Sequence, residues 1–144
     1  MRTVITKPNY NSFICKAKDR NGLWINGFVC RTMPDTMLNN TTLSIESDRG
    51  IVEIDQTTIC RPTNIKDKNG NSIYQWDICI VDDNKIGYVV YVEKDGCFCI
   101  KYDNSNNKPA LDIVLFESST IEVVGNVFDN SNFLIDKFII EKDN

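Results

Sequence analysis

The side chains that could do chemistry in this sequence are carboxylates and thiols, because the chain contains no histidine. A Ser-His-Asp or Cys-His nucleophile, a histidine general base and a histidine-ligated metal are therefore excluded. Four aspartates lie at the ends of strand-like runs, where two of them could pair as acid and base: Asp55, Asp77, Asp103 and Asp112. Aspartates in such places usually accept hydrogen bonds from the backbone amides of a turn. We therefore expect no enzymatic activity and no catalytic residue.

Six cysteines raise the question of disulfides or zinc: Cys15, Cys30, Cys60, Cys79, Cys97 and Cys99. Disulfides are not expected in a cytosolic chain of this length, whose core does not need them. Only Cys97 and Cys99 lie close together in sequence, whereas structural zinc sites normally use two such pairs. In a strand, these two sulfurs would share one face and Phe98 would lie on the other. We expect buried thiols, with no metal and no cofactor.

Aromatic residues near turns are the best candidates for a binding surface. Trp24 and Trp76, together with the tyrosines of the chain, could form a groove for a peptide or an unpaired base. Most of these rings are expected to pack in the core, but Trp76 adjoins a turn and precedes an acidic residue. The candidate binding surface consists of Trp24, Arg61, Tyr74 and Trp76.

The composition indicates a chain built mainly of strands. It has 18 Ile, 11 Val and 10 Thr against 2 Ala and 6 Leu, so strand formers far outnumber the best helix formers. The expected strands are Ser12–Lys16, Leu23–Arg31, Thr42–Glu46, Ile51–Ile54, Asp77–Val81, Gly87–Glu93, Cys97–Tyr102, Asp112–Phe116 and Thr120–Phe128. A spacing of about ten residues per strand and turn is typical of a small barrel or sandwich.

Two nearly identical segments mark turns in this pattern. Lys18–Gly22 reads KDRNG and Lys66–Gly70 reads KDKNG, and Asn-Gly between strand-forming runs is a strong hairpin signal. The residues that follow the two segments differ, so similar turns explain the repetition without an internal duplication. A short helix is expected only near Asn130–Lys137, where Asn130 or Ser131 could cap it.

The charge argues against a protein that coats nucleic acid or an anionic membrane, because the net charge is -4. Residues 1–72 carry ten Lys/Arg against seven Asp/Glu, and residues 73–144 carry six against thirteen. All five arginines lie in the first half: Arg2, Arg20, Arg31, Arg49 and Arg61. No apolar run is long enough to span a membrane, and the N-terminus lacks a signal-peptide core. We expect a cytosolic protein with no membrane partner.

Three blocks of the sequence resemble one family of phage and prophage proteins. Thr63–Ile78, with the sequence TNIKDKNGNSIYQWDI, resembles the central motif of the YopX family, which is roughly TGLKDKNGxxIYEGDI. Lys16–Phe28 is similar to the opening motif KxxxNGxWxxG of that family. Ile121–Leu134 is similar to its closing motif VIGNIYENPELL. The three blocks span most of the chain in the order that the family has.

The chain departs from the family pattern at a few positions. Asn64 and Trp76 stand where the family has glycine, so a turn before Asp77 must accommodate a bulky side chain. Ser131-Asn132 lacks the proline of the closing motif. The resemblance implies a mostly β protein with a small barrel of the SH3-like type, encoded by mobile elements and without an established biochemical activity.

These observations predict a mainly β fold, with a small SH3-like barrel, additional N-terminal β-hairpins and at most one short C-terminal helix. We expect an N-terminal β region over residues 1–59, the barrel core over 60–130 and a short helix or tail over 131–144, and these parts could form one compact domain. Structural roles in turns and caps are expected for Asp67, Asn69, Gly70, Asp77, Gly125 and Asn126.

The functional hypothesis is an accessory protein of a phage or prophage that acts as a non-enzymatic protein-binding module in the cytosol of the bacterial host. Its partner would be a protein of the host or the phage. The alternative is a nucleic-acid-binding accessory protein that uses the Arg-bearing half, with Trp24 or Trp76 stacked on a base. Self-association into a homo-oligomer is compatible with the opposite charges of the two halves and with exposed strand edges.

Overall fold

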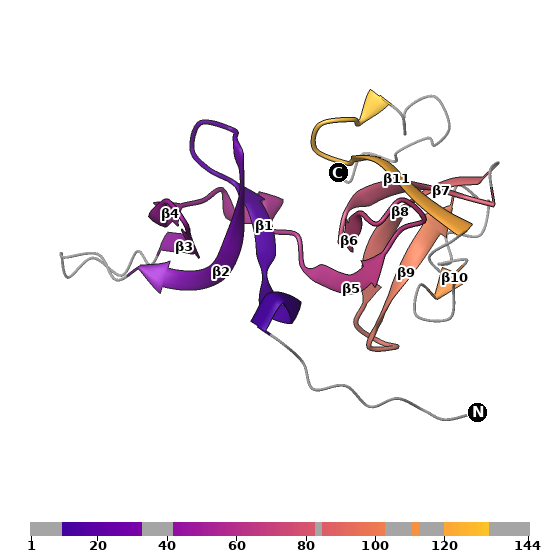
Figure 1. The fold of residues 1–144 in the computed structure, drawn as a ribbon, viewed down its shortest axis with the longest axis horizontal. Helices are drawn as coiled ribbons and strands as arrows, with labels where there is room; N and C mark the ends of the chain where they lie inside the picture. The colour runs from indigo at the N-terminus through magenta and orange to yellow at the C-terminus, as the bar shows by residue number, and fades with distance from the viewer. Residues whose placement is uncertain (1–9, 33–41, 83–84, 103–110, 113–119, 133–144) are drawn as a thin grey trace. The chain divides into compact units, whose positions relative to one another are not determined.

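The structure is a computed structural model that describes residues 10–32, 42–82, 85–102, 111–112 and 120–132 (Figure 1). The chain divides into two compact units, unit 1 over Met1–Pro62 and unit 2 over Thr63–Asn144. Most of the described residues lie in antiparallel strands, and no helix among them reaches seven residues. The prediction of a mainly β chain is therefore confirmed. None of the described helices has the length and apolar character that crossing a membrane requires.

Unit 1 is a four-stranded antiparallel sheet in the order β1-β2-β3-β4. Its elements are η1 (Tyr10–Phe13), β1 (Cys15–Lys18), β2 (Trp24–Thr32), β3 (Thr42–Ser47), β4 (Gly50–Glu53) and η2 (Gln56–Thr58). After β4 the chain returns along β1, where the amide of Cys60 donates to the carbonyl of Lys16 at 2.8 Å. The buried core consists of Ala17, Ile25, Ile45 and Ile54. The expected N-terminal hairpins, β1–β2 and β3–β4, are present.

Strand β2 pairs with two neighbouring strands along its length, and the pairing passes from β1 to β3 after Gly27. The residues from Trp24 to Gly27 pair with β1, whereas those from Phe28 onward pair with β3. A Cβ atom at Gly27 would lie 2.0 Å from the carbonyl oxygen of Glu46, far inside van der Waals contact. Glycine is required here because the backbones of β2 and β3 approach each other so closely. Gly27 is also the last glycine of the block that resembles the opening family motif.

Unit 2 contains a five-stranded antiparallel sheet in the order β10-β9-β8-β7-β11 and a two-stranded hairpin of β5 and β6. Its strands are β5 (Pro62–Lys66, beginning at the last residue of unit 1), β6 (Ser72–Tyr74), β7 (Asp77–Val81), β8 (Lys85–Val92), β9 (Cys97–Tyr102), β10 (Leu111–Asp112) and β11 (Ile121–Asn126). Its main core consists of Ile73, Cys79, Val81, Val89, Ile100 and Ile121. Because side chains alternate along β7, Ile78 faces the other way and packs against a smaller cluster: Ile86, Tyr88, Val124 and Val127.

The barrel predicted from the sequence is not closed within the described part of the chain. β10 and β11 form opposite edges of the sheet, and each is paired on one side only, to β9 and to β7. Closure would require the two edge strands to meet. The expected strand Asp112–Phe116 is described only at its first residue, which belongs to β10. The SH3-like character of this unit stays a prediction.

Two strands have the predicted bounds, several differ from the prediction by one or two residues, and the first is misplaced. β7 and β9 have the predicted bounds. The prediction of a strand at Ser12–Lys16 was wrong, because Tyr10–Phe13 form η1 and β1 runs over Cys15–Lys18. The tight turn that follows β1 fixes this register by pairing Lys18 with Trp24. Most of the predicted helix at 130–137 lies outside the described residues.

Candidate functional site

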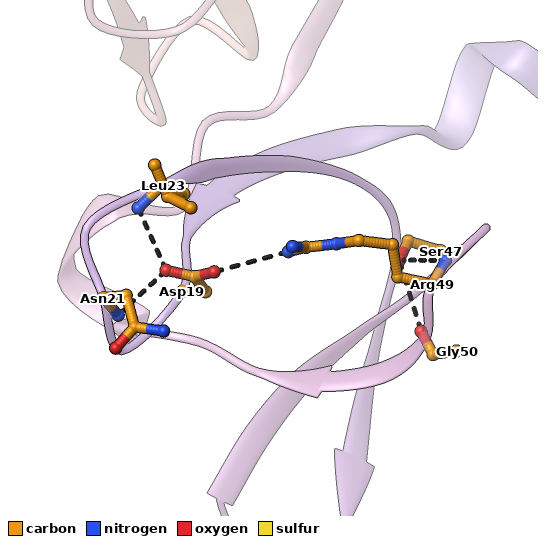
Figure 2. Close-up of polar contacts among 6 residues, drawn as sticks. All are labelled: Asp19, Asn21, Leu23, Ser47, Arg49 and Gly50. Atoms are coloured by element: carbon orange, nitrogen blue, oxygen red, sulfur yellow. Dashed lines mark hydrogen bonds and ion pairs between the residues drawn. The ribbon is translucent and has the colours of Figure 1, made fainter.

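The first Lys-Asp-Arg-Asn-Gly segment is a turn organised around the buried carboxylate of Asp19 (Figure 2). Oδ1 of Asp19 accepts hydrogen bonds from the amides of Asn21 and Leu23, both at 2.9 Å. Oδ2 accepts a hydrogen bond from Nη2 of Arg49 at 3.3 Å. Arg49 belongs to the turn between β3 and β4, so one carboxylate connects the two hairpin turns of unit 1.

The turn that carries Arg49 is itself fixed by a side chain. Oγ of Ser47 accepts a hydrogen bond from the amide of Arg49 at 3.2 Å and donates to the carbonyl of Gly50 at 3.3 Å (Figure 2). Arg20, in the first turn, forms an ion pair with Glu53 of β4. Arg20 and Arg49 are therefore both neutralised by carboxylates of unit 1.

The second segment, Lys-Asp-Lys-Asn-Gly, repeats this geometry in unit 2 around Asp67. Oδ1 of Asp67 accepts from the amides of Asn69 at 2.9 Å and Asn71 at 2.8 Å. Gly70 has a φ of +83°, the same value as Gly22 in the first turn, and this left-handed conformation favours glycine. Asp67, Asn69 and Gly70 thus lie together in this turn.

Asp67 also reaches across to the edge strand β11. Its Oδ2 accepts a hydrogen bond from the amide of Val123 at 2.9 Å, and the amide of Lys68 donates to the carbonyl of Ile121 at 2.9 Å. The turn between β5 and β6 therefore occupies backbone groups on the free side of β11. Unpaired edge groups are a template for strand addition, so this contact protects the edge of the sheet.

The surroundings of both carboxylates lower their pKa. For Asp19 the largest effect is the hydrogen bond from the amide of Leu23. For Asp67 burial raises the pKa, but the hydrogen bonds from the amides of Val123, Asn71 and Asn69 together outweigh it and hold the pKa below its ordinary value. Both groups are charged at neutral pH and act as fixed acceptors, which suits a structural role better than proton transfer.

The other candidate carboxylates that the structure describes also hold backbone amides. Asp55 caps η2, and its Oδ1 accepts from the amide of Thr57 at 3.0 Å. Asp77 is 2% exposed, and its Oδ2 accepts from the amide of Tyr74 at 2.8 Å. Asp55 and Asp77 belong to different units. Asp103 and the side chain of Asp112 lie outside the described residues.

The closing block of the sequence forms a turn around Asn126. Oδ1 of Asn126 accepts from the amides of Phe128 at 3.0 Å and Asp129 at 2.9 Å. Its own amide donates to Oδ1 of Asn130 at 3.1 Å. A Cβ at Gly125 would lie 2.4 Å from that same Oδ1 atom, so a larger residue there would displace the Asn130 side chain from its bond with Asn126. Gly125 and Asn126 therefore both lie in this turn.

The most unusual backbone conformation belongs to Trp76, in the turn between β6 and β7. Its φ is +74°, in the left-handed region that bulky residues rarely adopt. Its amide donates to the carbonyl of Val89 at 2.8 Å, and its carbonyl accepts from the amide of Val127 at 2.9 Å. These two bonds hold the backbone in place from both sides. The half-buried indole stacks on the ring of Tyr88, with 6.3 Å between the ring centroids and 17° between the planes.

The four residues of the predicted binding surface divide between the units. Trp24 and Arg61 belong to unit 1, whereas Tyr74 and Trp76 belong to unit 2 and flank the β6–β7 turn. The ammonium groups of Lys16 and Lys18 lie over the ring of Trp24, at 5.1 Å and 5.3 Å from its centroid. Trp24 is therefore covered by cations from β1, and Trp76 is the better candidate for contact with a partner.

The cysteines are thiols, and three of them are buried: Cys60, Cys79 and Cys99. Burial raises the pKa of Cys79 strongly, and it also raises the pKa of Cys15, although the nearby Arg61 partly opposes this. Thiols of this kind are poor nucleophiles. Over the described ranges, no three His, Cys, Asp or Glu side chains come together to hold a metal ion.

Sequence reasoning overlooked Asp19 and Arg49 as structural residues. Asp19 had a usable signal, because it occupies the same place in its segment as Asp67 does in the second segment. Arg49 had none, since its contact with Asp19 joins residues 30 positions apart. Of the five arginines, Arg2 lies outside the described residues, and Arg31 and Arg61 are exposed.

Comparison with known proteins agrees with the resemblance found in the sequence. No curated protein matches the chain. The sequence model of the family described as YopX protein matches residues 17–135, which include both aspartate-centred turns, the turn at Trp76 and the turn at Asn126. This match covers most of the chain, and the chain therefore belongs to the YopX protein family.

Proposed function

We propose that this YopX-family protein is a non-enzymatic protein-binding module of a phage or prophage, and that it acts in the cytosol of the bacterial host through the surface around Trp76. The observation that carries the proposal is the left-handed backbone of this tryptophan. Strain of this kind costs about 1–3 kcal/mol and is concentrated at functional sites. A glycine at position 76 would remove it.

The side chain of Trp76 has properties suited to a protein contact. It is only half-buried, it lies on the ring of Tyr88, and the backbone bonds to Val89 and Val127 fix its direction. A tryptophan that is held in one orientation loses little entropy on binding, and tryptophan is enriched among the residues that dominate binding energies. The family motif has glycine at this position, so the tryptophan would distinguish the partner of this chain.

The proposal of a non-enzymatic role is supported by what the carboxylates do. Each of four aspartates accepts a hydrogen bond from a backbone amide of a turn or cap: Asp19, Asp55, Asp67 and Asp77. A carboxylate committed in this way is a poor general base, because its charged form is already stabilised by these donors.

Nucleic-acid binding remains the second candidate function. It is favoured by the cluster of Lys16, Lys18 and Trp24 on β1 and β2, since cations beside an aromatic ring suit a phosphate backbone and a base. Against it, Arg20 and Arg49 are already paired with carboxylates. We therefore rank this function second.

The test compares the wild-type chain with Trp76→Gly and with Trp24→Phe as a matched control. Each purified protein is immobilised and exposed to a lysate of the bacterial host that carries the phage. We expect wild type and Trp24→Phe to retain the same protein, and Trp76→Gly to lose it while its unfolding midpoint stays equal or rises. The proposal is contradicted if Trp76→Gly retains as much of that protein as wild type does, or if wild type retains no protein reproducibly. Nucleic-acid binding with a steep salt dependence would establish the second candidate instead.

A further inference from the structure

Two thiols lie side by side on β9. The Sγ atoms of Cys97 and Cys99 are 3.7 Å apart, in agreement with the prediction that both share one face of the strand. Cys97 is half-buried, and Cys99 is 6% exposed. Phe98, between them, points to the other face and packs against the main core of unit 2. The pairing of β9 with β8 on one side fixes the backbone beneath both cysteines.

The separation of the two sulfurs suits a shared metal ion. A Zn–S bond measures about 2.3 Å, so an ion bound equally to two sulfurs 3.7 Å apart would have an S–Zn–S angle of about 107°. This is close to the tetrahedral angle that Zn²⁺ prefers. The ion could therefore bind both sulfurs without movement of the strand.

A disulfide between the same residues fits less well. Residues two apart in a strand have Cα atoms about 6.6–6.8 Å apart, at the upper limit of the range that disulfides span. The sulfurs would also have to approach from 3.7 Å to about 2.05 Å, whereas a shared metal ion requires no such approach. The regular pairing of Cys97 with Val92 and of Cys99 with Val90 leaves the backbone little freedom to ease this approach.

We propose that Cys97 and Cys99 form a two-thiolate site for Zn²⁺ or a similar thiophilic cation. Binding replaces the two S–H protons with two metal–sulfur bonds and releases both protons to solvent, so no oxidant is needed. Among the described residues no third ligand joins the pair, so the remaining coordination positions are filled by water or by the same pair from a second copy of the chain. The second arrangement completes a four-cysteine tetrahedral site.

Cobalt(II) is the probe for this site, because tetrahedral Co²⁺–thiolate complexes have characteristic visible and ultraviolet bands. Reduced, metal-free protein is titrated with Co²⁺ and then with Zn²⁺. We expect thiolate bands that saturate at one Co²⁺ per chain or per two chains and disappear when Zn²⁺ is added. Sedimentation of the loaded protein then distinguishes bound water from a second copy.

The variants Cys97→Ser and Cys99→Ser should each abolish the bands, whereas Cys30→Ser should leave them unchanged. Cys30 is a half-buried thiol of unit 1 and serves as the matched control. Cys97→Ser is the informative variant if Cys99→Ser fails to fold, because Cys97 is less buried. The absence of thiolate bands in wild type overturns the proposal, and so do bands that persist in Cys97→Ser. A loss of two hydrogen atoms in mild peroxide, without any Co²⁺ binding, would show a redox pair instead.

Discussion

Replacing Asp67 with asparagine tests the role of the turn that protects β11. Asparagine has nearly the same shape, and its single oxygen can still accept from the amides of Asn69 and Asn71. Its NH₂ group then faces the amide of Val123, which now donates to Oδ2 of Asp67 at 2.9 Å. The substitution therefore removes the bond from the amide of Val123 and the weaker bond from Nδ2 of Asn71 to the same Oδ2 at 3.4 Å. The two amide bonds of the turn and the bond from Lys68 to Ile121 remain.

The loss of stability follows from the burial of the Asp67–Val123 hydrogen bond. Hydrogen bonds to a charged group contribute about 1.5–3 kcal/mol, and a buried donor left without an acceptor costs about 1–3 kcal/mol. Both figures describe the same Val123 amide, on a half-buried residue, so they do not add in full. We expect the free energy of unfolding of unit 2 to fall by about 2–3 kcal/mol, which lowers the melting temperature by roughly 10–20 °C in a unit of this size.

The two tryptophans allow each unit to be followed separately. Trp24 is in unit 1 and Trp76 is in unit 2, and the chain has no others. In a Trp24→Phe background, the fluorescence of Trp76 during urea unfolding reports on unit 2. In a Trp76→Phe background, Trp24 reports on unit 1. A lower midpoint with an unchanged slope is the expected signature of lost stability.

Asp19→Asn in the Trp76→Phe background is the matched control. It keeps the same two turn bonds and loses only the contact with Arg49, whose side chain is 55% exposed. Exposed ion pairs contribute little to stability, so we expect a clearly smaller loss in the free energy of unfolding than for Asp67→Asn. Equal losses for the two variants, or no change in unit 2, would refute the protective role of the Asp67–Val123 contact.

Three further predictions concern the backbone and the carboxylates. Gly27→Ala should unfold unit 1 or strongly lower its urea unfolding midpoint. Gly22→Ala, whose Cβ would have no atom within 4 Å, should lower the free energy of unfolding by about 1 kcal/mol. Trp24 fluorescence measures both effects. The free energy of unfolding of unit 2 should be constant near neutral pH and fall below about pH 4. The reason is that the pKa of Asp67 is lowered in the folded state, so the stabilisation by this carboxylate is lost as the pH falls through that folded-state pKa. Acid denaturation of the Asp67→Asn variant should show a smaller fall. Gly125→Ala should destabilise unit 2 because its Cβ would collide with Asn130, which calorimetry detects.

Much of the fold could be predicted because its signals are local. Short apolar runs between polar turn residues give the bounds of β7 and β9, and Asn-Gly gives the turns. The first strand was misplaced because nothing between Ser12 and Lys16 marks the end of a helical turn; the register comes from the pairing of Lys18 with Trp24. Closure of a barrel depends on contacts between distant strands, which a single sequence does not contain.

The candidate site was harder to predict for the same reason. The sequence indicates that Asp67 caps a turn, but its bond to Val123 joins residues 56 positions apart. Trp76 was selected because it adjoins a turn, and its left-handed backbone was not foreseen beyond the need to accommodate a side chain. The placement of Trp24 and Trp76 in different units also required the structure.

The positions that match the family motifs explain the shape of the backbone more than a function. Gly27 and Gly125 permit close approaches, and Asp67 holds a turn against an edge strand. At the two positions where the family has glycine and this chain does not, Asn64 and Trp76, φ is still positive, at 64° and 74°. The chain thus keeps the glycine conformation without the glycine. Asparagine tolerates that conformation well, but tryptophan does not, so only the substitution at position 76 calls for an explanation outside the fold.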